Sequence, residues 1–527
     1  MRHLVIPLLF LIVQSTYGQV FMPTDSLSIA RVALLQGEWL DLTNEGTLDF
    51  VFMTATDKDS DTITAFRMDD SLSTRDSLTL SLPGSIGFEA VDIDNNSKLD
   101  LLTQAAFDDT TYLTVYYQMD SGAYEAVVID SLAAERYEAM DLDQDGTKEI
   151  VYSTHDQFLH FRKQNASGGW ETFHEPIATF PSGNWTFYDS DNDGLKDLVI
   201  SGTDGTTPSS LFYSNQNGSF TAVDSGEFAL LNARFFPADF NSDGTYNLAT
   251  IGFDLTGTLH VRLHVKDTVV MLDGLQNIEN FEVFAADLDA NGECDLSVSV
   301  KNTSGTSSSH IYFNQGGLQF IEQDLFIPGA LLSDNYADID SDGDLDRMIV
   351  SNRSDSTTFT FFNNTSDLGN KGPSIPQNPM TFQTGRGTML LWEESQDDLT
   401  NSKSITYDVF IGSSTNTADV VSSEFDLTNG KRFKASRGNS GFEESMLVRN
   451  LPTGTYDYGI QSIDNSLHYL SGGSGGGGET NCNGLPTACG SFTVCATIEY
   501  APLVACLGKE VALTIGMETG WYSYHYG

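Results

Sequence analysis

Between about residues 20 and 368, short apolar runs alternate with acidic or Asn/Gly-rich turns. The runs LVISG, IVYS and MIVS are rich in β-branched residues, and no sustained helical periodicity separates them. Further strand-like stretches end in Asn/Gly turns, as in SLFYSNQNGSF and HIYFNQGGLQF. This pattern predicts an all-β array of short strands, with no alternation of strands and helices.

The strand pattern repeats together with an acidic loop. Intervals of 51, 49, 48, 50, 48 and 51 residues separate the first positions of seven such loops. The loops are DLTNEGTLD at Asp41, DIDNNSKLD at Asp92, DLDQDGTKE at Asp141, DSDNDGLKD at Asp189, DFNSDGTYN at Asp239, DLDANGECD at Asp287 and DIDSDGDLD at Asp338. A period of about 50 residues suits a four-stranded blade, so we predict a seven-bladed β-propeller over residues 19–368. An open β-solenoid is the alternative.

The ends of the repeat array predict how the ring closes. The seventh repeat reaches FTFFNNTS and then lacks the outer strand of the other blades. The N-terminal stretch QVFMPTDSLSI resembles that missing strand. We therefore expect residues 20–29 to pair with residues 359–362, which removes the open edges of the sheet.

The acidic loops place oxygen ligands at positions 1, 3, 5 and 9, with a glycine at position 6 in most copies. Carboxylate and amide oxygens on a flexible loop suit calcium, and the glycine permits the positive φ that folds the loop back. The alternative is that Asp, Asn and Gly only form turns. The first loop, with Thr43 and Glu45, is the most degenerate and is expected to be empty. The candidate calcium ligands are Asp92, Asp94, Asn96, Asp100, Asp141, Asp143, Asp145, Glu149, Asp189, Asp191, Asp193, Asp197, Asp239, Asn241, Asp243, Asn247, Asp287, Asp289, Asn291, Asp295, Asp338, Asp340, Asp342 and Asp346.

These loops resemble the FG-GAP or VCBS repeats of integrin α-subunits and of many secreted bacterial proteins. The resemblance covers about residues 20–368. It implies a calcium-binding propeller in which the loop aspartates hold calcium and stiffen the blades. Ligands of that family usually engage other loops, so the resemblance does not identify a partner.

A change in composition at Gly372 predicts a second module. Residues 372–470 resemble a fibronectin type III-like sandwich, with Trp392 in the core and Tyr456 as the tyrosine corner. Such modules stacked behind a propeller resemble bacterial surface proteins. Residues 471–478 (SGGSGGGG) predict a flexible linker, and residues 479–527 predict an incomplete immunoglobulin-like segment.

The N-terminus and the cysteines indicate export. Residues 1–18 have the basic start, apolar run and small-residue exit of a cleaved signal peptide. Cys482, Cys489, Cys495 and Cys506 lie close together and allow two disulfides in three connectivities, whereas Cys294 stands alone. A zinc site is the weaker alternative, because the spacing is wrong and no histidine lies among them. We expect a secreted or outer-surface protein with no transmembrane span.

Charge narrows the possible partners. The chain carries 73 Asp+Glu against 26 Lys+Arg, a formal net charge of -47. This field repels phosphate backbones and anionic lipids, so nucleic acid is not an expected partner.

Three functions fit the pattern. The first is a non-enzymatic binding or adhesion module for an extracellular protein or glycan. The second is a polysaccharide lyase-like enzyme, and the third is a purely structural stalk. A lyase needs a base and a group that stabilises the developing anion. The histidines that could supply the base are scattered, with His155, His160 and His174 in the third repeat and His260 and His264 in the fifth. The GxSxG match around Ser474 lies in the Gly-rich linker and lacks the flanking strand and helix of a hydrolase. We therefore predict no catalytic site.

Overall fold

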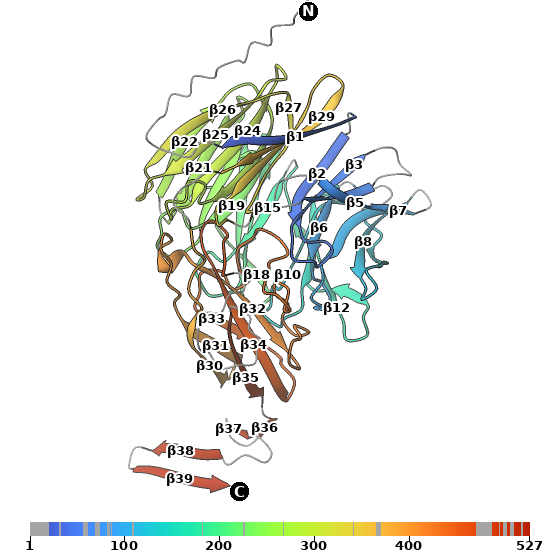
Figure 1. Cartoon of the computed structure of the whole chain (residues 1–527). Coiled ribbons are helices and arrows are strands. Elements are labelled where there is room, and N and C mark those ends of the chain that lie inside the picture. The colour runs from blue at the N-terminus through green and yellow to red at the C-terminus, as the bar shows by residue number, and fades with distance from the viewer. Residues whose placement is uncertain are drawn as a thin grey trace, which may run out of the picture.

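The structure is a computed structural model of the whole chain (Figure 1). It describes residues 21–30, 33–55, 62–68, 74–81, 85, 87–107, 110–181, 183–224, 227–266, 268–340, 342–364, 370–470, 487–494, 496–498, 503–505, 511–517 and 520–526. These residues are almost entirely strands and turns, with one short 3-10 helix at Ser402–Ser404. The predicted signal peptide, Gly-rich linker and Cys482 and Cys506 lie outside the described residues, as do the side chain and placement of Cys495.

Seven antiparallel sheets form the blades of a β-propeller. In blades 1, 2, 4, 5 and 6 consecutive strands are neighbours, so their connections are hairpins; in blade 3 the fifth strand pairs with the third, and in blade 7 the outer strand comes from the N-terminus. Blade 1 contains β2 (Ala33–Leu40), β3 (Asp49–Ala55), β4 (Thr62–Met68) and β5 (Thr74–Ser81), and blade 2 contains β6 (Phe88–Val91), β7 (Asp100–Phe107), β8 (Thr110–Gln118) and β9 (Tyr124–Asp130). Blade 3 contains β10 (Ala134–Met140), β11 (Glu149–Thr154), β12 (Phe158–Gln164), β13 (Trp170–Thr172) and β14 (Ile177–Ala178). Blade 4 contains β15 (Asn184–Tyr188), β16 (Asp197–Thr203), β17 (Pro208–Asn215) and β18 (Phe220–Asp224). Blade 5 contains β19 (Leu231–Ala238), β20 (Asn247–Phe253), β21 (Leu259–Val265) and β22 (Thr268–Leu275), and blade 6 contains β23 (Ile278–Ala286), β24 (Asp295–Asn302), β25 (Ser307–Asn314) and β26 (Phe320–Ile327). Blade 7 contains β27 (Ala330–Ala337), β28 (Asp346–Asn352) and β29 (Ser356–Asn363).

The N-terminal strand closes the ring, as predicted. β1 (Met22–Ala30) pairs antiparallel with β29, with Leu27 opposite Phe359, and supplies the outer strand of blade 7. Figure 1 shows the dark blue β1 lying across the yellow strands of the last blade. The first and last segments of the propeller thus belong to one sheet, and blade 7 has four strands, as the neighbouring blades 6 and 1 do.

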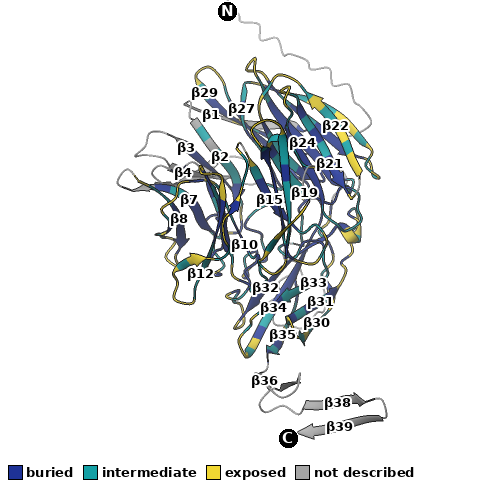
Figure 2. Ribbon diagram, turned by 180° about the vertical axis from the view of Figure 1, so that it is seen from behind, coloured by how far each residue is buried: buried dark blue, intermediate teal, exposed yellow. Residues whose placement is uncertain are grey.

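Apolar side chains fill the seams between blades. The second strands of blades 4 to 7 are almost completely buried, whereas the outer strands β9, β22 and β26 are largely exposed (Figure 2). At the seam between blades 7 and 1, Phe50 and Phe52 pack against Phe359 with ring centroids 5.9 and 5.4 Å apart. Because each blade has an apolar face on both sides, the faces are buried only when the blades stand next to one another in a ring.

The second module is a β-sandwich of two three-stranded sheets. One sheet contains β30 (Gln377–Thr384), β31 (Gly387–Glu393) and β33 (Ser445–Val448), and the other contains β32 (Thr406–Gly412), β34 (Gly454–Ile463) and β35 (Ala488–Val494). Trp392 is buried and packs edge-on against Tyr407. The Tyr456 hydroxyl donates to the Pro452 carbonyl at 2.8 Å, which is the bond expected of a tyrosine corner.

One predicted boundary is wrong. We placed residues 488–494 in a separate immunoglobulin-like tail, but β35 pairs with β34 over seven residues and completes the second sheet of the sandwich. The Gly-rich segment therefore connects two strands of the same sheet. Beyond β35 the strands pair only in twos, β36 (Ala496–Ile498) with β37 (Leu503–Ala505) and β38 (Val511–Met517) with β39 (Gly520–Tyr526).

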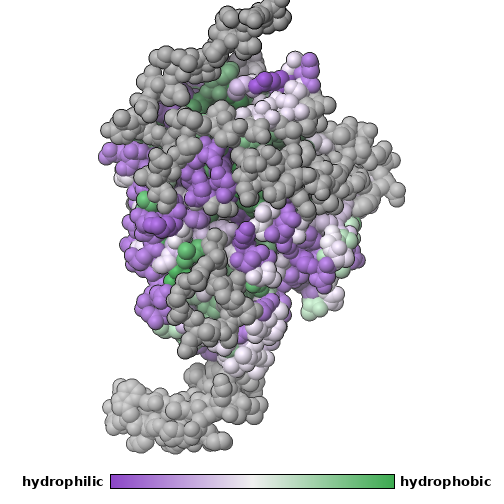
Figure 3. Space-filling view, in the orientation of Figure 1, coloured by the Kyte–Doolittle hydropathy of each residue, from purple (hydrophilic) through white to green (hydrophobic). Residues whose placement is uncertain are grey.

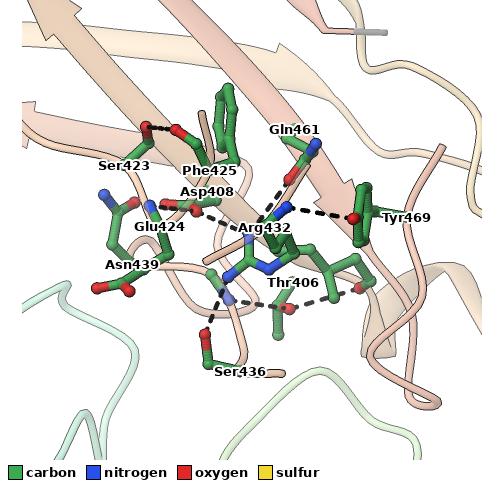
Figure 4. Close-up of polar contacts among 12 residues, drawn as sticks. Thr406, Asp408, Ser423, Glu424, Phe425, Arg432, Ser436, Asn439, Gln461 and Tyr469 are labelled. Atoms are coloured by element: carbon green, nitrogen blue, oxygen red, sulfur yellow. Dashed lines mark hydrogen bonds and ion pairs between the residues drawn. The ribbon is translucent and has the colours of Figure 1, made fainter. Parts of the chain in front are cut away.

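A long irregular segment between β32 and β33 is anchored by a buried ion pair. The Arg432 guanidinium lies 2.7 Å from the Asp408 carboxylate, and the two side chains are 2% and 0% exposed. Arg432 also donates to Gln461 and Ser436, and its backbone N–H donates to the Tyr469 hydroxyl (Figure 4). These bonds compensate the buried charges and fix the segment to the sheet.

Candidate metal centres

Each acidic loop connects the first and second strands of its blade. Because the first strands of all blades run in the same direction around the ring, the seven loops lie at one end of the propeller. That end faces the sandwich, which is drawn in orange and red below the blades in Figure 1. The repeat thus gathers seven acidic loops at the boundary between the two modules.

The aspartate at position 1 closes each loop. Asp189 accepts bonds from the N–H groups of Asp193 and Gly194, at 3.1 and 2.8 Å. The same pair of bonds, from positions 5 and 6, occurs in all seven loops, at Asp41, Asp92, Asp141, Asp189, Asp239, Asp287 and Asp338. The aspartate at position 1 therefore holds the loop backbone together. Its hydrogen bonds are expected both of a calcium site and of a simple turn, so they do not distinguish the two.

The residue at position 6 adopts positive φ in every loop. The φ of Gly194 is 84°, and Ser97, where glycine was expected, has a φ of 64°. The residue at position 4 is also left-handed in six loops, for example Asn192 with a φ of 57°. The sequence did not predict this second left-handed position, although three of the six residues there are Asn, which tolerates this conformation.

The side chain at position 9 joins the loop to the rest of the blade. Asp197 accepts bonds from the N–H of Ser190 at position 2 and of Asn215 at the end of β17. The Asn215 amide then donates to the Leu142 carbonyl of the preceding blade at 2.9 Å. Gln118, Asn314 and Asn364 make the same inter-blade bond in blades 2, 6 and 7. From the sequence alone, Asn215 and Asn314 are interpreted only as part of Asn/Gly turns.

The side chain at position 3 fits a cation ligand best. The Oδ1 atoms of Asp143, Asn241, Asp289 and Asp340 are buried and have no hydrogen-bond partner within the described part of the chain. In four of the loops three acidic ligand atoms lie within 4.8 Å of one another, and these loops begin at Asp92, Asp141, Asp189 and Asp287. Buried oxygens that converge without donors are the arrangement that a hard cation such as calcium requires.

The pKa values of the loop carboxylates also favour a bound cation. Burial, and then the neighbouring carboxylates Asp342 and Asp340, raise the pKa of Asp338 to about 7. Burial and Asp94 raise the pKa of Asp100 to about 8. A bound cation would relieve both the desolvation and the repulsion, because it stabilises the charged form.

Blade 3 differs, because a lysine enters its loop. The Lys163 ammonium, on β12, lies 2.9 Å from Asp143, 2.8 Å from Asp145 and 2.7 Å from Glu149. Burial alone would lower the pKa of Lys163, but these carboxylates raise it above its ordinary value. The chain therefore already supplies a positive charge to the loop at Asp141, which we predicted to bind calcium like the others. In blade 5 Lys266 contacts Asp243 at 2.7 Å and remains mostly exposed.

The acidic loops also contact the sandwich. Hydrogen bonds join them to the second module and its junction: Asp41 N–H to Phe433 O, Asn95 Nδ2 to Val420 O, Arg449 N–H to Gln144 O, Ser404 Oγ to Asp239 Oδ2, Asp287 N–H to Asn465 O, Ser466 Oγ to Asp287 Oδ2 and Asn370 Nδ2 to Gly343 O. A Cβ on Gly146 would lie 2.2 Å from the Val420 carbonyl, and one on Gly292 would lie 2.0 Å from that of Leu399. In these two loops position 6 thus needs glycine for close approach as well as for its φ.

A cavity of ≈ 1060 Å³ lies between the loops and the sandwich. Basic side chains of both modules line it, among them Lys148, Lys434, Arg437 and Arg449, beside acidic side chains such as Glu89 and Glu138. Figure 3 shows that the described residues on one face of the molecule are mainly hydrophilic, as the acidic composition implies.

The histidines of the third repeat have separate surroundings. His155 is exposed beside Glu135, His160 stacks on Tyr152 with centroids 5.2 Å apart, and His174 packs edge-on against Phe161. In blade 5 His260 pairs with Asp254, and His264 is buried beside Phe228. These contacts give each histidine a packing or surface role.

No helix within the described residues is long and apolar enough to cross a membrane.

No family model matches the chain, and no curated protein matches it. Solved structures similar to it include the SapL1 lectin in complex with alpha methyl fucoside (TM-score 0.34, 11% identity, 60% of this chain and 95% of that one). They also include the WD40 domain of Toxoplasma gondii coronin (0.40, 11%, 67% and 90%) and BBS1N in complex with ARL6DN, soaked with lead (0.41, 12%, 68% and 100%). At these scores the likenesses give no basis for an argument about function.

Proposed function

We propose that the chain is an exported, non-enzymatic binding or adhesion module whose propeller is stabilised by calcium in its acidic loops. The observation that carries this proposal is the set of buried oxygens at position 3 that have no hydrogen-bond partner among the described residues, each in a loop with carboxylate or amide side chains at positions 1, 5 and 9. The resemblance of the loops to FG-GAP or VCBS repeats supports the same proposal. Calcium would neutralise the clustered carboxylates and hold the loops in one conformation.

Calcium in these loops would also stiffen the boundary between the modules. The serines Ser404 and Ser466 donate directly to the position-1 carboxylates of blades 5 and 6, and loop backbone groups make further bonds to the sandwich. A loop held by a cation presents these groups in fixed positions. We infer a rigid two-module unit suited to presenting a binding surface outside the cell.

Export is proposed from the signal-like N-terminus and the disulfide chemistry. Cys489, on β35, is disulfide-bonded. Disulfides persist in oxidising compartments, which supports a secreted or outer-surface location. Cys294 is free and buried, consistent with a packing role.

The proposal makes the ligand an extracellular protein or glycan and excludes turnover. A glycan array and a pull-down, each with calcium and with a chelator, test the first part, and we expect calcium-dependent capture. Incubation with pectin, ulvan and alginate tests the second. Release of unsaturated sugars would contradict the non-enzymatic assignment and direct attention to the third-repeat histidines.

A further inference from the structure

A second kind of acidic cluster lies on the outer strands of blades 5 and 6, away from the acidic loops. The register of β25 and β26 places His310 opposite Asp324 and Tyr312 opposite Glu322. Tyr312 belongs to the apolar cluster that joins blades 5 and 6, so this face of blade 6 turns toward blade 5. There, β22 contributes Asp273; β22, β25 and β26 lie close together in Figure 1.

The ligand atoms of the cluster converge. The imidazole Nδ1 of His310 lies 2.7 Å from Asp324 Oδ1 and 3.1 Å from Glu322 Oε1. One ligand atom each from Asp273, His310 and Glu322 lies within 4.8 Å of the others. The buried Tyr312 hydroxyl donates to Asp273 Oδ2 at 3.3 Å and orients that carboxylate toward blade 6.

The charges of this cluster are unbalanced. Three carboxylates surround one imidazole, and the other ring nitrogen, Nε2, lies 3.2 Å from the Ser308 hydroxyl. When that nitrogen carries the proton, the lone pair of Nδ1 faces two carboxylates. With the proton on Nδ1 instead, the neutral ring donates to one carboxylate and accepts from Ser308 at Nε2. The other carboxylates still repel one another, and a bound cation relieves that repulsion.

We propose that Asp273, His310, Glu322 and Asp324 bind one divalent transition-metal ion of the zinc class. An imidazole combined with carboxylates suits zinc better than calcium, which prefers oxygen ligands alone. The side chains of Glu322 and Asp324 are 41% and 68% exposed, so the ion has a path from solvent. The ion joins the outer strand of blade 5 to the outer hairpin of blade 6 and acts as a clip across the seam.

The test is equilibrium dialysis of the full chain against micromolar zinc, with millimolar calcium present to occupy the acidic loops. Bound zinc is counted by elemental analysis, and the melting temperature is measured in the same buffers. The variants are His310→Gln and Asp273→Asn. The matched control is His260→Gln, because His260 lies on the neighbouring blade and contacts one carboxylate, Asp254, at 3.0 Å.

The wild type and His260→Gln should each bind one zinc and melt at a higher temperature with it. Both cluster variants should lose at least about tenfold in zinc affinity, and zinc should no longer raise their melting temperature. Zinc binding by His310→Gln equal to that of the wild type, or no zinc bound by the wild type, overturns the site. Unchanged affinity in Asp273→Asn overturns the clip between blades. If His310→Gln does not fold, Glu322→Gln replaces it, with the same expected loss.

Discussion

Replacing Lys163 with methionine removes the cation that the chain supplies to the loop of blade 3. The methionine keeps most of the apolar stem but loses the ammonium, which also lies 5.2 Å from the centroid of the Phe173 ring. The change leaves Asp143, Asp145 and Glu149 without their ammonium partner, and Glu149 is completely buried. Removing one partner of a buried ion pair costs about 3 to 5 kcal/mol. We expect the lower end of this range, because burial and its neighbours already raise the pKa of Glu149 to about 8 and it can take up a proton.

Calcium should reverse this loss. Without Lys163, the loop at Asp141 has the same ligand pattern as its neighbours, so the variant should bind one more calcium than the wild type. In chelator the variant should therefore unfold at a lower denaturant concentration, with a deficit of about 3 kcal/mol, and millimolar calcium should recover part of it. Denaturant titrations with and without calcium, together with calcium counting, measure both effects.

A matched control is Lys301→Met in blade 6. Lys301 makes a single contact with Glu279 at 2.6 Å, and the two side chains are 27% and 50% exposed. Surface pairs contribute about 0 to 1 kcal/mol, so this variant should differ little from the wild type in either buffer. The reasoning is refuted if Lys163→Met is no less stable than Lys301→Met in chelator, or if it binds no additional calcium.

Three further predictions follow from local geometry. Ser97→Gly should raise the free energy of unfolding by about 0.5 to 1 kcal/mol in a denaturant titration, because Ser97 is left-handed where the other loops have glycine; a loss of stability would contradict this. Deleting Met22–Ala30 should leave the edge of β29 unpaired and cause aggregation in light scattering, whereas an unchanged monodisperse sample would argue against closure by β1. Burial lowers the pKa of His264 to about 4, so the unfolded state takes up a proton first as the pH falls below about 6.5, and stability is lost between that pH and 4. His264→Leu should gain about 2 kcal/mol relative to the wild type between pH 7 and pH 4.5, and parallel pH profiles of the two proteins would show that His264 does not contribute.

The repeat in the sequence was sufficient to predict the propeller. Strong period-50 spacing and the missing outer strand of the seventh repeat predicted both the seven blades and the pairing of β1 with β29. The sandwich boundary could not be predicted in this way. The Gly-rich segment has the composition of a linker between domains, and only the pairing of β35 with β34 shows that the chain returns to the same sheet.

The acidic loops were found from the sequence, but their differences were not. Lys163 lies on a strand outside the loop motif, and only the fold of blade 3 brings its ammonium to the carboxylates. The contact between Gly146 and Val420 likewise joins residues far apart in the sequence. Asp273 and His310 come from different blades, so no local pattern indicates that they meet.

Calcium titration of the chelator-treated protein, monitored by calcium counting and melting temperature, tests the central claim most directly. Our account predicts one ion in each of the loops beginning at Asp92, Asp189, Asp239, Asp287 and Asp338, and none in the wild-type loop that Lys163 enters. With dissociation constants of about 10⁻⁴ to 10⁻³ M, millimolar calcium should stabilise the protein by about 0.4 to 1.4 kcal/mol for each occupied loop and raise the melting temperature accordingly. Asp338→Ala should remove one ion from the count. A melting temperature and protease cleavage pattern that chelation leaves unchanged would show that the loops are turns and that calcium has no part in the fold.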